Sequence, residues 1–172
     1  MASKIPGNII QNLINLDLNH KQEDLLRFNC TEKYSREDIV NYSTSTGIVF
    51  PDFYVDFLIN VGACELFTRY DNRNWGGRTI IEVTEFMRLR DIIDYNEAVS
   101  PDLIDNITEF VVIGMNSWRD TYLAIDLRRQ SNNFGIFTSD SYPEEWHLET
   151  DCWYNFEDWL VLLIEGNGRI PR

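Results

Sequence analysis

The sequence predicts a single α+β domain built on a mostly antiparallel central sheet. Three observations predict this class. Helical periodicity is confined to the two ends and one middle segment, whereas extended runs gather between them. The 172 residues suit one domain, residues 1–172, that can bury about two-thirds of its unfolded surface. Finally, no internal repeat, linker or low-complexity run divides the chain.

The N-terminal part of the chain carries three helical patterns. Residues 9–28 have apolar side chains three or four positions apart, and their many asparagines predict a short or frayed helix. Ser35 and Asp38 have the spacing of a capping box at the start of a second helix, which we expect to end near Gly47. A third helix begins at Pro51 and has a wide apolar stripe.

Extended runs dominate the middle of the chain. Residues 64–67 and 79–83 have the composition of short strands separated by a polar loop. Thr84 is a suitable N-cap for a middle helix that continues to about Tyr95. Three longer runs follow, joined by polar turns, so consecutive antiparallel pairing is their simplest arrangement. They cover residues 109–114, 121–127 and 134–139.

The charge of the chain limits its partners. The formal net charge is −13, which argues against nucleic acids and anionic membranes, because phosphates require a basic surface. It suits a basic protein partner, although solubility alone explains it equally well. No stretch approaches the ~20 apolar residues of a membrane helix, and the first residues do not resemble a secretory signal. Three cysteines without a CxxC pair indicate free thiols in the cytoplasm.

Few residues have the spacing that catalysis requires. The two histidines are His20, which lies in a polar segment, and His147, which lies beside Glu145 and Glu149. One imidazole at irregular spacing is a weak signal for a metal site, and a solvated loop explains it better. Cys64 has no base nearby in the sequence and is expected in the core. The sequence therefore predicts no catalytic residue, no metal and no cofactor.

The long loop before the last helix has an unusual composition. Residues 140–159 contain no Lys or Arg, and acidic and aromatic side chains alternate irregularly. Aromatic side chains supply contact area and carboxylates attract cations, so this composition is typical of a surface that binds a basic protein. The alternative is that the loop is merely solvated and that Trp146 folds back into the core. Phe156 and Trp159 on the final helix are expected to be core residues, and Asn155 is expected to cap that helix. The predicted partner-binding residues are Glu144, Glu145, Trp146, Glu149 and Asp151.

Asp126 ends one of the alternating strands, immediately before a polar, charged segment. An aspartate in this place is either a catalytic carboxylate or a turn-forming residue. No histidine or other metal ligand lies near it in the sequence, so we expect its carboxylate to accept backbone N–H groups in a turn.

Several segments in order resemble the SUKH superfamily, the Smi/Knr-like proteins. The opening has a capped helix, a proline, an aromatic-rich helix, a glycine and a small apolar strand, as in SREDIVNYSTSTGIVFPDFYVDFLINVGACELF. The runs FVVIG and TYLAIDL resemble the middle hairpin of the family, FGIF its next strand and FEDWLVLLI its closing helix. The resemblance covers about residues 33–165.

The resemblance implies a fold and a function. It implies an α+β domain with N-terminal helices, a middle helix and a C-terminal helix around the sheet. Many bacterial members are cytoplasmic immunity proteins that bind and neutralise a cognate polymorphic toxin, often a nuclease; others are linked to cell-wall regulation. The leading hypothesis is therefore a non-enzymatic immunity protein whose acidic, aromatic-bearing surface covers a basic toxin. The alternatives are a regulatory scaffold linked to cell-wall processes and a small hydrolase that uses the acidic loop.

Overall fold

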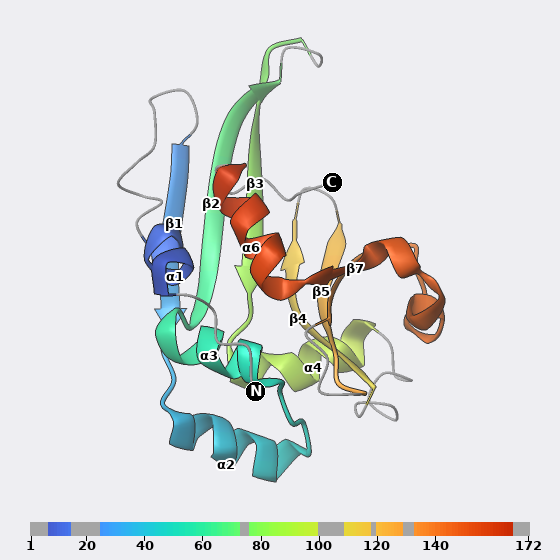
Figure 1. Ribbon diagram of the computed structural model, residues 1–172. Coiled ribbons are helices and arrows are strands. Elements are labelled where there is room, and N and C mark those ends of the chain that lie inside the picture. Colours follow the sequence, from blue (N-terminus) through green and yellow to red (C-terminus); the bar gives the residue numbers. More distant parts are fainter. Residues whose placement is uncertain are drawn as a thin grey trace.

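The computed structural model describes residues 7–14, 25–72, 76–99, 109–117, 120–128 and 133–166. These residues form a seven-stranded sheet with helices packed on it, so the predicted α+β class is confirmed (Figure 1). Each strand pairs antiparallel with the next strand in the chain. The strands are β1 (Leu25–Glu32), β2 (Ala63–Asn72), β3 (Arg78–Phe86), β4 (Phe110–Asn116), β5 (Thr121–Asp126), β6 (Asn133–Thr138) and β7 (Trp153–Asn155).

The helices begin where local side chains satisfy their backbone. Ser35 Oγ accepts from the Asp38 N–H at 3.1 Å, and the Asp38 carboxylate accepts from the Ser35 N–H at 2.7 Å. This confirms the predicted capping box. Asn155 likewise caps the last helix by accepting two backbone N–H groups. The helices are α1 (Gly7–Ile14), α2 (Arg36–Thr46), α3 (Asp52–Asn60), α4 (Leu89–Val99) and α6 (Phe156–Glu165), with 3-10 helices η3 (Pro143–Leu148) and η4 (Thr150–Cys152).

The helix predicted over residues 9–28 is wrong in its last part. Residues 25–28 belong to β1, where Phe28 is the register partner of Leu66 in β2. Pairing with a strand that is distant in the sequence determines the secondary structure of this segment and overrides the local spacing of its apolar residues. Residues 15–24 lie outside the described part of the chain.

The helix predicted to begin at Thr84 is also wrong in its first turn. Thr84 is a buried residue of β3, and α4 begins only at Leu89. Threonine favours both helix N-caps and strands, and here Glu82, Thr84 and Phe86 alternate as the buried face of β3. The two strands predicted at 64–67 and 79–83 are correspondingly longer, because β2 and β3 pair over nine residues.

Two hydrophobic clusters lie on opposite faces of the sheet. The larger one lies between the sheet and α1, α3 and α6, and Figure 1 shows α3 and α6 on the same side of the strands. At its centre the Phe156 ring lies 4.9 Å from Phe53 and 5.0 Å from Phe134. The smaller cluster covers β4 to β6 on the other face and consists of Phe110, Val112, Ala124, Phe137 and Trp146. α4 contributes side chains to both clusters.

A buried amide joins helix α4 to the sheet. The side chain of Asn96 is fully buried, donates to the Val112 carbonyl at 2.8 Å and accepts from the Val112 N–H at 2.8 Å. β3 pairs with β4 only from Gly114 to Asn116. Val112 lies outside this paired segment, and there the Asn96 amide takes the place of a β3 partner. Asn96 therefore satisfies backbone groups where the sheet does not.

Candidate partner-binding surface

The acidic loop between β6 and β7 contains the two short 3-10 helices η3 and η4. Glu149 is half-buried and accepts hydrogen bonds from the Ser141 hydroxyl and, at 3.2 Å, from the Cys152 thiol. This carboxylate therefore holds the loop together. The carboxylates of the loop that are exposed include Glu144, Glu145 and Asp151.

Trp146 is fully buried and belongs to the smaller hydrophobic cluster. Its ring stacks on Phe137 with 4.2 Å between centroids and lies 6.1 Å from Phe110. Of the two alternatives for this residue, the structure shows the core residue, and the buried Trp146 ring presents no surface to a partner in this conformation. The exposed apolar side chains of the loop are Tyr142 and Leu148, which are 69% and 68% exposed.

Asp126 forms the predicted turn at the end of β5. Its Oδ1 accepts from the Arg128 N–H at 2.9 Å and from the Arg128 Nε–H at 3.1 Å. The Arg128 guanidinium lies 4.4 Å from the centre of the Phe110 ring. The turn thus holds the Asp126 carboxylate in place. The Arg128 guanidinium that it binds lies over the Phe110 ring, which belongs to the smaller cluster.

We expect Asp126→Asn to lower the free energy of unfolding by about 1 kcal/mol, because an amide oxygen is a weaker acceptor for the Arg128 groups. Urea denaturation of the variant measures the loss. Glu97→Gln on the exposed face of α4 is the control and should change stability by less than about 0.5 kcal/mol. Partner binding by folded Asp126→Asn should equal that of the wild type, and its loss would contradict a purely structural carboxylate.

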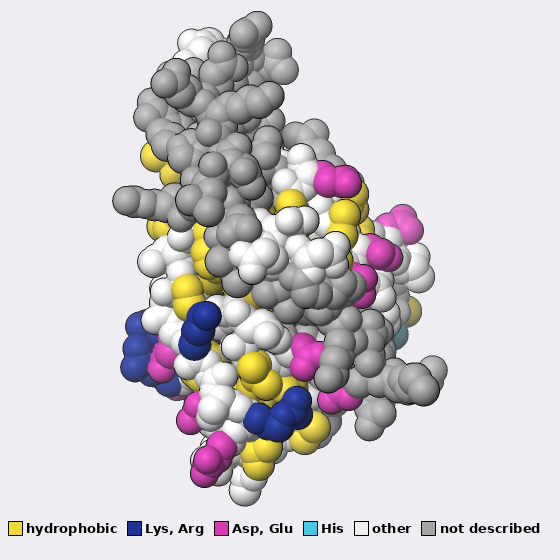
Figure 2. Space-filling model, turned by 60° about the vertical axis from the view of Figure 1, so that its left-hand side comes forward, with side chains coloured by type: hydrophobic (Ala, Val, Ile, Leu, Met, Phe, Trp, Pro, Cys, Tyr) yellow, Lys and Arg dark blue, Asp and Glu magenta, His cyan; other side chains and the backbone are white. Residues whose placement is uncertain are grey.

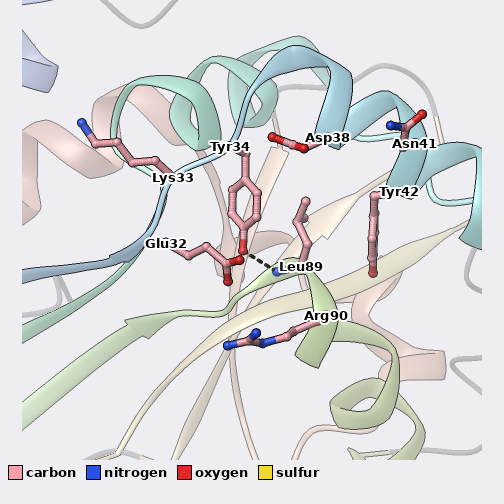
Figure 3. Close-up of a pocket in the computed structure, with 8 residues that line it drawn as sticks. All are labelled: Glu32, Lys33, Tyr34, Asp38, Asn41, Tyr42, Leu89 and Arg90. Atoms are coloured by element: carbon pink, nitrogen blue, oxygen red, sulfur yellow. Dashed lines mark hydrogen bonds between the residues drawn. The ribbon is translucent and has the colours of Figure 1, made fainter.

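One pocket of about 350 Å³ lies between the end of β1, the start of α2 and the start of α4 (Figure 3). At its centre the Tyr34 hydroxyl accepts from the Leu89 N–H at 3.0 Å. Glu32 Oε2 and the Tyr42 hydroxyl are buried and have no hydrogen-bond partner among the described residues. The lining consists of Glu32, Lys33, Tyr34, Asp38, Asn41, Tyr42, Leu89 and Arg90.

The charges around this first pocket balance. Two carboxylates and two cationic side chains line it, so it has no preference for a partner of either sign. Burial, together with the nearby Glu32 carboxylate, raises the pKa of Tyr34 to about 12, although the hydrogen bond from the Leu89 N–H acts in the opposite direction. Figure 2 shows the side of the molecule that carries β1, where described basic, acidic and hydrophobic side chains lie beside one another.

A second pocket of about 340 Å³ lies where α4 meets β3 and β4. Its lining contains three carboxylates and no Lys or Arg: Glu85, Met87, Asp91, Asp94, Tyr95, Ala98 and Met115. Burial raises the pKa of Glu85, and Glu65 raises it further, whereas Arg88 lowers it. None of these residues is predicted as a site residue from the sequence. Glu85, for example, falls in the segment that is predicted to be helical from Thr84.

Comparisons with known proteins identify the class and then a relative. The chain belongs to the SMI1 / KNR4 family (SUKH-1), whose model matches residues 33–161, and this confirms the resemblance seen in the sequence. It is similar to the immunity protein RhsIB of Dickeya dadantii (strain 3937), with 26% identity over 146 residues, 83% of this chain and 81% of that protein. No solved structure matches the chain significantly.

Two kinds of feature are absent from the described residues. Among them, no three His, Cys, Asp or Glu side chains are grouped so that they could hold a metal ion. No described helix combines the length and the apolar character needed to cross a membrane.

Proposed function

We propose that this chain is an immunity protein, a non-enzymatic cytoplasmic protein that binds a cognate toxin domain and neutralises it. Membership of the SMI1 / KNR4 family carries the proposal. The similarity to an immunity protein supports it, because the alignment covers most of both chains. The toxin is expected to be a basic protein, since the chain carries a net charge of −13.

The mechanism that fits this surface is occlusion. An enzyme that acts on nucleic acid binds phosphates through a basic channel, and an acidic protein of complementary shape competes for the same channel. In the acidic loop, the carboxylates of Glu144, Glu145 and Asp151 are exposed, and Tyr142 and Leu148 supply apolar contact area beside them. No covalent chemistry is needed, because tight binding alone excludes the substrate.

The experiment that tests this function uses a candidate toxin domain, sought among the proteins encoded by the neighbouring genes. Co-expression should restore growth to cells that produce the toxin domain, and the two purified proteins should form a stoichiometric complex. A toxin domain that is neither bound nor inhibited by the folded protein would contradict the proposal and would favour the regulatory scaffold.

We expect Glu144→Gln/Glu145→Gln to slow association with the toxin domain several-fold and to flatten its salt dependence. Exposed charges act at long range, and salt screens them beyond ~8 Å at physiological ionic strength, so they change the association rate more than the dissociation rate. Stopped-flow mixing at several salt concentrations measures both effects. The control is Glu37→Gln/Asp52→Asn, which removes the same charge from the exposed starts of α2 and α3. Equal slowing in both variants would show that only net charge matters and that the loop has no special role.

A further inference from the structure

One row of side chains crosses five strands on the face of the sheet that carries η3. Its members are consecutive register partners, which point to the same face in antiparallel strands. Tyr122 at one end is also the register partner of Phe137, on which Trp146 stacks. The row therefore leads from the covered part of this face to β1. It consists of Asn29, Glu65, Glu85, Met115 and Tyr122.

Over β2 and β3 this face has part-exposed apolar side chains. Phe67 and Val83 are register partners and both are partly exposed, and nearby Ile81 is 60% exposed. The acidic loop lies on the same face, because the Tyr122 ring is 6.4 Å from Trp146 of η3. The face and the loop are thus adjacent parts of one surface.

Two carboxylates stand directly opposite each other in the row. Glu65 and Glu85 are register partners, and like charges in this arrangement destabilise a sheet. The Asn29 amide donates to Glu65 at 3.2 Å, which orients that carboxylate but adds no positive charge. A cation placed at Glu85 would offset this repulsion, so the unbound protein carries an electrostatic cost that binding can remove.

The second pocket opens beside Glu85 and has the chemistry of a site for a long cationic side chain. Met87, Ala98 and Met115 offer apolar contact to an aliphatic stem, and carboxylates surround them. Asp91 already accepts from Arg88 Nε–H at 2.7 Å. Glu85 and Asp94 are therefore the carboxylates assigned to an incoming charge.

We propose that the sheet face over β2 to β4 is a docking surface for the basic partner, and that the second pocket receives one of its Lys or Arg side chains. This inference rests on the proposed immunity function and adds the surface that recognises the toxin. Charge complementarity selects the occupant: three carboxylates and no cationic side chain line the second pocket, whereas charges balance in the first.

The test measures binding of the toxin domain by full-length variants whose fold is checked by circular dichroism. Ala98→Arg places a bulky cation in the pocket from an exposed position on α4, and Glu85→Gln/Asp94→Asn removes two carboxylates. Each should weaken binding about 10-fold or more, mainly through faster dissociation. The control Glu37→Gln/Asp52→Asn removes the same charge as the double variant and should stay within about 2-fold of the wild type.

A double-mutant cycle identifies the contact itself. One Lys or Arg of the toxin domain, replaced by alanine, should weaken binding to the wild type but not to Glu85→Gln/Asp94→Asn. Folded pocket variants that bind as tightly as the wild type would overturn the docking surface and leave the immunity function intact. A wild-type protein that does not bind its toxin domain would overturn both.

Discussion

Replacing Trp146 by alanine is expected to lower the free energy of unfolding by about 3–5 kcal/mol. The indole is fully buried and stacks on Phe137 at 4.2 Å. Among the described residues the smaller cluster has five buried members, so the loss of its largest side chain leaves a large cavity in a small core. Thermal and urea unfolding measure the loss.

The matched control for this change lies in the same 3-10 helix. Leu148 is 68% exposed, so Leu148→Ala should alter stability by less than about 0.5 kcal/mol. Dissociation of the toxin domain per folded Trp146→Ala molecule should remain that of the wild type. Unchanged stability combined with faster dissociation would instead restore Trp146 as a residue that contacts the partner.

Replacing Asn96 by leucine is expected to lower the free energy of unfolding by about 2–4 kcal/mol, because it leaves two buried backbone groups of β4 without a hydrogen-bond partner. The N–H and carbonyl of Val112 both lose their partner, and leucine has no polar atom to replace the amide. Urea denaturation measures the cost, and hydrogen exchange at the Val112 amide should become faster at the same time.

Asn60 offers a comparison with the same local hydrogen bond. Its amide donates to the Asp56 carbonyl four residues earlier, as Asn96 donates to Ile92, but Asn60 is exposed. Asn60→Leu should therefore cost less than about 0.5 kcal/mol. A similar cost at both positions would mean that the helical hydrogen bond, rather than the contact with β4, accounts for the effect of Asn96.

Elements specified by local chemistry could be predicted from the sequence. Ser35, Asp38 and Asn155 cap helices in the structure as their spacing predicts, because a cap bonds to backbone only two or three residues away. Asp126 is similar, since its turn partner is two residues away. β1 could not be predicted, because its strand character comes from pairing with β2, which lies beyond α2 and α3 in the chain.

The recognition surface depends even more on distant contacts. The second pocket combines Glu85 of β3, Asp94 and Ala98 of α4, and Met115 of β4. No fixed spacing connects these residues, so only the pairing of β3 with β4 shows that they are neighbours. Trp146 illustrates the reverse: its acidic sequence neighbours suggest a surface, yet its ring packs on β6, whose position no local pattern indicates.

The order of the strands has a consequence for how the chain acquires its fold during synthesis. Because the spatial order β1 to β7 is also the chain order, the sheet can grow strand by strand as the chain leaves the ribosome. The largest closures join β1 to β2, across α2 and α3, and β3 to β4, across α4, and their entropic cost grows only slowly with loop length. α6 follows all seven described strands in the chain, so the larger cluster receives Phe156 and Trp159 only after those strands have been synthesised. Until then the part of the apolar sheet face that α6 covers stays exposed to aggregation.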